Sequence, residues 1–379
     1  MTITKVTDAG LDKSRIVTPL IINGDMSVAQ RGTSTTGVGA DVGHFACDRW
    51  RYGETGSLSF RATMSQSTTV PTGQGFLTSF KVDCTTAQGS LASADRFGLD
   101  QKIEAQNLIN LKQGTSSADK TTLSFWVRSN LTGQFNIWVY KPDGTARSFV
   151  KGYTISSADT WEKKIINIPA DTDSSGAIVN DNGEGWRVTW MLGAGSNFTS
   201  GSIATTWENF AAANIGVSQT NFASSTDNEF YLTGVQLEVG EFDANTIPTF
   251  PFESFGNNLR RCQRYLETIG DQGIDTIIGY GWGSGSDTAR TLYSFQTTKR
   301  AAPTMSDSLS SSRQYRIEFV SPDGTATNQN STSTPSFSSP SVVNSGYIQV
   351  GGFSSIGGGH NGFLRYNNTT TIITADAEL

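Results

Sequence analysis

Strict alternation in the segment Thr122–Ser129 (TLSFWVRS) constrains the fold of this chain more than any other feature. Successive side chains of a β-strand face opposite sides, so Leu123, Phe125 and Val127 point one way and Trp126 points the other. Similar short segments recur along the chain without regularly alternating helices, which is typical of antiparallel sandwiches. The pattern therefore predicts an all-β protein.

The first body is expected over residues 20–245 as a β-sandwich of the jelly-roll type. Its further predicted strands are Leu20–Ile22, a strand region that begins at Asp48–Tyr52, Gly75–Cys84, Phe97–Ala105, Gln134–Tyr140, Thr160–Ile168, Gly185–Leu192, Ala212–Gln219 and Glu229–Glu238. One helical turn is expected at Asn107–Lys112. Residues 1–19 are interpreted as an attachment segment.

Pro248 and Pro251 mark a boundary, and residues 246–273 are predicted to be a linker with a helix at Asn257–Ile269. Apolar residues recur at three- and four-residue spacing on one face of this helix. We expect that face to form the interface of a fibre-like homotrimer, because a symmetric contact could bury it. Its members are Leu259, Cys262, Tyr265, Leu266 and Ile269. The arginines on the opposite face are either solvated or ion-paired across subunits.

The second body, residues 274–379, is predicted to be a C-terminal β-sandwich domain, distal and receptor-binding. Its expected strands are Asp275–Trp282, Arg290–Gln296, Gln314–Phe319, Tyr347–Gly351, Phe363–Tyr366 and one near Thr370–Thr374. A polar loop rich in Ser and Thr is expected at Thr325–Ser341.

Composition supports packed β domains and argues against several classes of partner. The 379 residues include 40 Gly, 8 Trp and 21 Phe, and only 16% are charged. Such aromatic content favours cores over disorder, and abundant Gly suits turns. A net charge of −6 without a basic block argues against a nucleic-acid partner.

The three cysteines and the chain start indicate where the protein is made. Cys47, Cys84 and Cys262 cannot form a closed disulfide framework and are expected to be buried thiols, which suits a reducing cytoplasm. The N-terminus lacks a signal-peptide pattern, and the apolar runs are too short to span a bilayer. We therefore expect synthesis in a cytoplasm, no membrane insertion, and release by another route such as lysis.

An ordered set of motifs carries a resemblance to known proteins. In chain order it comprises NGDM, DRW, QKIEA, TLSFWVRS, DTWEKKIINIP, GWRVTWMLGAG, FYLTGVQLEVG, LRRCQRYLE, KRAAPTM and ADAEL. The first body resembles the jelly-roll carbohydrate-binding modules of glycoside hydrolases, and the whole order resembles tail-fibre or other virion-fibre proteins of tailed bacteriophages. The resemblance implies homotrimers that recognise host-surface glycans and join other virion proteins through the N-terminal segment.

Metal and cofactor chemistry has few candidates. The resemblance implies a structural Ca²⁺, for which Asp25 and Asp48 are candidate ligands, but the stretch Thr233–Gly234 lacks the acidic residue expected on the last strand. The sequence Asp171–Gly176 is similar to the start of a calcium loop but lacks the glutamate at its twelfth position, so a solvated turn is the alternative. No cofactor is expected.

Catalytic chemistry is equally sparse. His44 and His360 lie in different bodies without a G-x-S-x-G elbow, and Gly357–Gly362 matches a dinucleotide motif only in spelling, since a strand-like segment follows it. Glycoside hydrolysis needs two nearby carboxylates, for which Glu104, Asp181 and Glu184 are the residues to check.

Aromatic side chains are the remaining functional signal, because sugar rings stack on Trp and Tyr. The predicted carbohydrate-binding residues are Trp126, Trp138, Trp186, Tyr280, Trp282 and Tyr347. Trp161, Trp190 and Trp207 compete for this role, and most Trp residues of a sandwich belong to its core.

The sequence thus favours a non-enzymatic virion protein, a tail or capsid fibre subunit that binds host cell-surface carbohydrate. The alternatives are a glycan depolymerase of a tail spike and a purely architectural spacer. Release of reducing ends from host polysaccharide distinguishes the enzyme, and a lack of glycan binding indicates the spacer.

Overall fold

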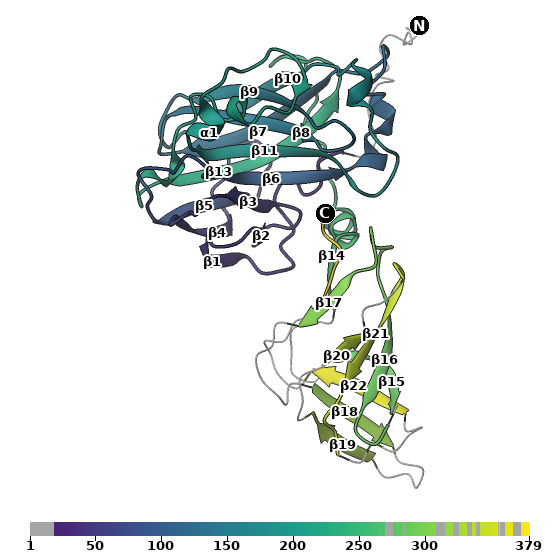
Figure 1. Ribbon diagram of the computed structural model, residues 1–379. Coiled ribbons are helices and arrows are strands. Elements are labelled where there is room, and N and C mark those ends of the chain that lie inside the picture. The colour runs from purple at the N-terminus through teal and green to yellow at the C-terminus, as the bar shows by residue number, and fades with distance from the viewer. Residues whose placement is uncertain are drawn as a thin grey trace, which may run out of the picture. The chain divides into compact units, whose positions relative to one another are not determined.

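A computed structural model describes the chain over most of its length. The described residues are 19–269, 276–283, 285–307, 315–320, 326–331, 336–338, 342–354, 356, 361–366 and 373–379. The chain divides into two compact units, Met1–Phe255 with Leu379, and Gly256–Glu378 (Figure 1). The predicted attachment segment lies outside the described residues except for Pro19, and so do Gly357–His360 of the glycine-rich motif.

The N-terminal unit is a sandwich of two antiparallel sheets. The six-stranded sheet has the order β1-β4-β5-β13-β7-β10. Its strands are β1 (Ser34–Val38), β4 (Arg61–Ser67), β5 (Ser79–Thr86), β7 (Thr121–Ser129), β10 (Glu162–Ile168) and β13 (Glu229–Val239). The chain passes repeatedly between this sheet and the second one, as expected for a sandwich in which consecutive strands share a core.

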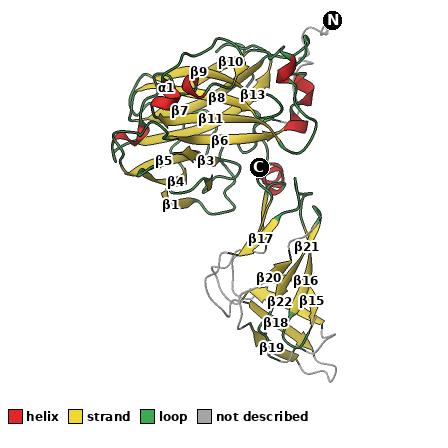
Figure 2. Cartoon of the chain, in the orientation of Figure 1, coloured by secondary structure: helices red, strands yellow, loops and turns green. Residues whose placement is uncertain are grey.

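The second sheet of this unit is seven-stranded, with the order β12-β9-β8-β11-β6-β3-β2. Its strands are β2 (Gly43–His44), β3 (Arg51–Thr55), β6 (Arg96–Glu104), β8 (Gly133–Lys141), β9 (Arg147–Ile155), β11 (Glu184–Ala194) and β12 (Glu208–Asn209). Helical segments are short: 3-10 turns lie at Ala105–Asn107, Ile109–Leu111, Ser174–Gly176, Ala212–Asn214 and Phe222–Ser224, and helix α1 spans Ser196–Thr199. Figure 2 shows strands dominating both units.

The core of the N-terminal unit lies between its two sheets and is rich in aromatic rings. Leu123, Phe125 and Val127 are fully buried there, which confirms the side predicted from alternation. Phe125 meets Trp190 edge to face at 5.5 Å, an arrangement that aromatic quadrupoles favour. Burial of such rings is the largest favourable term in holding the sheets together.

The C-terminal unit has two further antiparallel sheets. One has the order β14-β23-β17 and the other the order β19-β18-β22-β15-β16-β21-β20. Their strands are β14 (Leu266–Ile269), β15 (Ile277–Gly283), β16 (Ala289–Ser294), β17 (Thr304–Asp307), β18 (Tyr315–Val320), β19 (Ala326–Asn330), β20 (Ser336–Ser338), β21 (Ser345–Val350), β22 (Asn361–Tyr366) and β23 (Ile373–Asp376). Ile269, Ile348, Leu364 and Ile373 belong to one buried cluster of this unit.

Several expectations need correction. Leu20–Ile22 is buried but forms bends rather than a strand, and Ala212–Gln219 contains a 3-10 turn. The predicted helix Asn257–Ile269 is helix α2 (Phe255–Gln263) followed by strand β14. Strands β19 and β20 lie within the loop predicted at Thr325–Ser341, whose residues 332–335 and 339–341 are outside the described part.

The three cysteines are free and buried, as predicted. Burial raises the pKa of the Cys47 thiol well above its ordinary value, which keeps it protonated and unreactive. Within the described residues, no helix is long and apolar enough to cross a membrane.

Candidate functional site

The three tryptophans predicted as sugar platforms in the N-terminal unit are largely covered. Trp186 is 1% exposed and packs in the core against Trp207 at 5.3 Å, and Trp138 is 2% exposed. Trp190 and Trp207 are buried as well. Trp126 is half-buried on the outer face of its sheet. The buried rings of Trp138 and Trp186 therefore offer no face for a sugar in this structure.

The aromatic residues predicted in the C-terminal unit lie together on an exposed sheet face. Tyr280 and Trp282 are on β15 and Tyr347 is on β21. Leu292 on β16 and Phe363 on β22 complete the set, which we call the aromatic face. The exposed fractions are 60% for Tyr280, 36% for Trp282, 51% for Leu292, 46% for Tyr347 and 39% for Phe363. Such a cluster of exposed large apolar side chains is typical of a binding surface.

Strand register brings these side chains together. Tyr280 pairs with Phe363 across β15 and β22, and Leu292 pairs with Tyr347 across β16 and β21. The ring centroids of Tyr280 and Phe363 are 5.3 Å apart, and those of Trp282 and Tyr347 are 6.1 Å apart, both edge to face. Directly opposed side chains in a sheet lie on the same face. The pairing of the strands therefore brings these side chains together.

Alternation along each strand buries the neighbours of these residues. Ile278, Thr291, Ile348 and Leu364 are buried on the opposite side of the sheet. The Thr291 hydroxyl donates a hydrogen bond of 2.9 Å to the Tyr280 carbonyl oxygen, and a Cβ on Gly279 would meet this hydroxyl at 2.3 Å. Gly279 thus leaves room for a contact that holds the strand carrying Tyr280 and Trp282.

Polar groups lie among the rings. Arg290, opposite Trp282 in register, donates through Nε to Gln349 Oε1 at 2.7 Å. Arg365 is 2.8 Å from Glu318 through Nε, and its guanidinium lies 5.7 Å from the Phe363 ring centroid. Apolar rings beside fixed amide, guanidinium and carboxylate groups can stack on a sugar ring and hydrogen-bond its hydroxyls.

The sequence indicated part of this face. Aromatic type and adjoining Gly-rich segments predict Tyr280, Trp282 and Tyr347 as site residues, but they do not predict Leu292 and Phe363. Both missing residues lie in segments predicted as strands, and their alternation with Thr291 and Leu364 was a usable signal. Register between non-consecutive strands was the information that the sequence lacked.

The candidate calcium ligands are held by protein donors. Asp25 Oδ1 accepts a hydrogen bond of 3.0 Å from the Ser27 hydroxyl, and Asp48 accepts from both the backbone and the side chain of Gln30. Among the described residues, no group of three or more His, Cys, Asp or Glu side chains could hold a metal ion.

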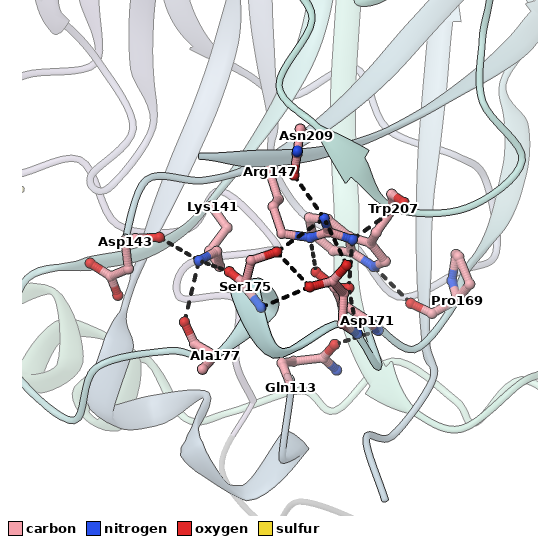
Figure 3. Close-up of polar contacts among 11 residues, drawn as sticks. Gln113, Lys141, Asp143, Arg147, Pro169, Asp171, Ser175, Ala177, Trp207 and Asn209 are labelled. Carbon is pink, nitrogen blue, oxygen red and sulfur yellow. Dashed lines mark hydrogen bonds and ion pairs between the residues drawn. The ribbon is translucent and has the colours of Figure 1, made fainter. Parts of the chain in front are cut away.

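The segment Asp171–Gly176 is more than a solvated turn, because Asp171 is buried. Its carboxylate is paired with Arg147, and a Cβ on Gly176 would meet Asp171 Oδ2 at 2.3 Å. Nearby, the ammonium of Lys141 donates to the carbonyl oxygens of Asp143, Ser175 and Ala177 (Figure 3). Two side-chain cations therefore stabilise this loop.

The three carboxylates that are candidates for catalysing hydrolysis already have ion-pair or hydrogen-bond partners within the protein. Glu184 lies 3.0 Å from Lys102 and 2.8 Å from Arg187. Burial acts to raise the pKa of Glu184, but Arg187 and Lys102 outweigh it and leave the pKa below its ordinary value. Glu104 is buried and accepts from Gln106, and Asp181 is exposed and accepts from the backbone of Gly183.

The apolar stripe predicted as a trimer interface is largely covered within the chain. Cys262, Tyr265, Leu266 and Ile269 are buried, and Leu259 is half-buried. Leu266 and Ile269 belong to β14, which pairs with β23, so they do not continue the face of α2.

No protein-family profile matches the chain. No curated protein matches its sequence. Among solved structures, the enzymatically active domain of bacteriophage CBA120 tailspike protein 4 is 14% identical with a TM-score of 0.32, over 58% of this chain and 21% of that one. A putative sugar binding protein from Bacteroides thetaiotaomicron is 12% identical with a TM-score of 0.31, over 59% of this chain and 100% of that one.

A family 11 carbohydrate-binding module from Clostridium thermocellum, solved with a mixed-linked tetrasaccharide, is 10% identical with a TM-score of 0.28. It covers 56% of this chain and 98% of the module. The chain thus has structural similarity to carbohydrate-binding jelly-roll domains and to a tailspike domain at low identity, and it spans only 21% of that tailspike domain. Similarity at this level transfers no residue roles.

Proposed function

We propose that this protein binds carbohydrate through the aromatic face of its C-terminal unit. The supporting observation is the exposure of Tyr280, Trp282, Leu292, Tyr347 and Phe363 on one sheet face, with Arg290 and Gln349 beside them. Rings of this kind stack on the C–H faces of sugars, and the polar groups select the hydroxyl pattern.

Binding without cleavage is part of the proposal. A glycosidase needs one carboxylic acid with a raised pKa near a second, ionised carboxylate. Glu184, one of the residues selected for that role, has a lowered pKa and is ion-paired with Lys102 and Arg187. Both features favour a structural role for this carboxylate.

We further propose that the protein is a fibre subunit of a tailed-phage virion, acting in host attachment as a homotrimer. The ordered motifs from NGDM to ADAEL support this role. Three copies of a weak site would raise avidity without any new contact. Since the stripe from Cys262 to Ile269 is largely buried in the single chain, the threefold contact would use other surfaces.

The test is retention on an array of bacterial surface glycans. Trp282→Ala should weaken binding about two- to tenfold, since loss of a stacking ring removes roughly 0.5–1.5 kcal/mol. Val342→Ala, which shortens another exposed apolar residue of the same unit, is the matched control and should bind normally. Equal binding by wild type and Trp282→Ala would contradict the proposed face.

Two further measurements separate the alternatives. Reducing ends appearing when the protein is incubated with a retained glycan would establish an enzyme instead of a binder. Retention of no glycan at all would favour an architectural spacer. Light scattering that shows only a single chain at micromolar concentration would contradict the trimer.

A further inference from the structure

The outer face of the seven-stranded sheet in the N-terminal unit gathers positive side chains. Inward residues such as Tyr52, Leu99, Val188 and Trp190 belong to the core, so their strand neighbours lie on the opposite face. That face, which we call the arginine face, carries Arg51 on β3, Arg96, Asp100 and Lys102 on β6, and Glu184 and Arg187 on β11. Four cations and two carboxylates thus share one surface of a chain whose net charge is −6.

Register places these side chains in rows across the strands. Arg51 lies opposite Asp100, and Asp100 lies opposite Thr189, which in turn lies opposite Trp138. The neighbouring row contains Lys102, Arg187 and Tyr140. The rows bring charged and aromatic side chains from separate segments onto one sheet face.

Three of the four cations have carboxylate partners. Arg51 donates to both oxygens of Asp100, at 2.9 Å from Nε and 2.8 Å from Nη2. Lys102 and Arg187 share Glu184 at 3.0 Å and 2.8 Å, and Lys102 also donates to the main-chain oxygen of Leu379. Both carboxylates of the arginine face, Asp100 and Glu184, are therefore already paired with cations.

Arg96 is the remaining cation, and it has no acidic partner among the described residues. Its Nε donates to the Thr55 hydroxyl at 3.2 Å. Its guanidinium lies 4.8 Å from the Trp138 ring centroid and 5.5 Å from that of Phe198. Burial lowers the pKa of Arg96 and the nearby charge of Arg187 lowers it further, while the charge of Asp100 offsets only part of this shift.

Aromatic rings lie beside this charge. Trp138 stacks on Phe210 with centroids 5.8 Å apart, and Tyr140 meets Phe210 at 5.4 Å. Phe210 is 39% exposed, and the Arg187 guanidinium lies 5.6 Å from the Tyr140 ring. A guanidinium fixed beside rings is the arrangement that suits a ligand with both a carboxylate and an apolar ring face.

Hydrogen-bonding groups on the same face also lack partners. Thr189 is 5% exposed, Trp138 is 2% exposed, and neither Thr189 Oγ1 nor Trp138 Nε1 has a hydrogen-bond partner among the described residues. Buried polar atoms without partners are uncommon and costly in folded proteins. A ligand that displaced the covering side chains could satisfy them.

We propose that the arginine face binds the carboxylate of an acidic saccharide, such as a uronic acid unit, with Arg96 as its charge partner. Arg96 would donate to the carboxylate through its planar fork, and Tyr140 and Phe210 would contact the sugar ring. This inference rests on the proposed carbohydrate-binding function but concerns the other unit of the chain. The protein would then prefer negatively charged saccharides over neutral ones at the arginine face.

The test uses a polyuronate and the same polymer after its carboxyl groups have been reduced to alcohols. By titration calorimetry, wild type should bind the polyuronate at least tenfold more tightly than the reduced polymer. Arg96→Gln should lower the affinity for the polyuronate about 10- to 100-fold, because a charge-assisted hydrogen bond is lost. The reduced polymer should bind wild type and Arg96→Gln alike.

Arg128→Gln is the matched control. Arg128 also lies over an aromatic ring on an outer sheet face, 5.0 Å from Tyr231, but it is paired with Asp159. The same loss of charge there should leave polyuronate affinity unchanged. If Arg96→Gln lowers the melting temperature and cannot be compared, Arg96→Lys replaces it and should show a smaller loss.

Each outcome decides the proposal. Polyuronate affinity that is equal in wild type and the Arg96 variants, or reduced equally by Arg128→Gln, would overturn it. Trp282→Ala separates it from the proposed function, since this variant should lose array binding of neutral glycans while keeping polyuronate affinity. Neutral glycan binding without polyuronate binding would overturn the arginine face alone.

Discussion

The guanidinium of Arg147 and the carboxylate of Asp171 form two parallel hydrogen bonds, Nε to Oδ2 at 2.6 Å and Nη2 to Oδ1 at 2.8 Å. Arg147 begins β9 and Asp171 follows β10, so the pair joins two sheets of the sandwich (Figure 3). Both side chains are buried, so neither can recover water if its partner is removed.

Replacing one member of this pair should be strongly destabilising. Asp171→Ala is expected to lower the free energy of unfolding by about 3–5 kcal/mol, because Arg147 would be left buried with only the exposed Asp173 carboxylate, 3.8 Å away, as a counter-charge. Urea denaturation monitored by Trp fluorescence measures this change. Asp173→Ala removes the exposed carboxylate of the same loop and should cost about 1 kcal/mol, the usual contribution of a cap. Equal losses in the two variants would contradict the role of the buried pair.

The aromatic face should contribute to binding rather than to stability. Tyr347→Ala is expected to change the free energy of unfolding by no more than about 1 kcal/mol, because the side chain is 46% exposed. Ile348→Ala, one residue along β21, should cost about 2–5 kcal/mol because it opens a cavity in a fully buried cluster. Chemical denaturation of both variants checks the contrast, and a similar loss from Tyr347→Ala would indicate a packing role.

Acid stability should depend on Glu184. Its folded-state pKa is below that of the unfolded chain, so its contribution is present at neutral pH and is lost as the pH falls below about 4. Glu184→Gln should therefore be less stable than wild type at pH 7, with the difference shrinking toward pH 3. Melting temperatures between pH 3 and 7 test this. Glu241→Gln, which breaks only an exposed pair with Lys120, should show little effect at any pH.

Gly234 should not tolerate a side chain. Its φ is +61°, and a Cβ there would lie 2.6 Å from Phe76 and 3.0 Å from Trp126. Gly234→Ala is expected to cost roughly 2–4 kcal/mol, from backbone strain and from displaced rings. At Gly73, φ is +76° but nothing lies within 4 Å of a Cβ, so Gly73→Ala should cost only about 1–2 kcal/mol. Thermal unfolding that ranks the two variants in reverse would contradict the crowding.

The sequence predicted strands best where alternation was strong and both ends were marked. Phe97–Ala105 and Thr122–Ser129 each match an observed strand within one residue. Leu20–Ile22 failed because an apolar run indicates burial but not pairing. There the Gln101 side chain takes the place of a neighbouring strand, accepting from Ile22 N and donating to its carbonyl oxygen, both at 2.8 Å.

Non-local contacts account for the other differences. The helical spacing after Gln263 continued in the sequence, but Leu266–Ile269 pairs with Ile373–Asp376, about a hundred residues away. Trp138 is predicted from the sequence as a sugar platform. In the fold, Phe210 stacks on its ring and Ile215 packs in the same buried cluster. Tyr280, Trp282 and Tyr347 could be selected from residue type and flanking glycines, but their proximity depends on strand order.

The ammonium of Lys141, surrounded by three main-chain oxygens, has a consequence for how the protein tolerates its surroundings. A dissolved ion in such a cage would come and go with its concentration, whereas this positive group is tethered to the polypeptide itself. The positive charge that holds the loop around Ser175 is therefore present at any concentration of divalent cations and in the presence of a chelator.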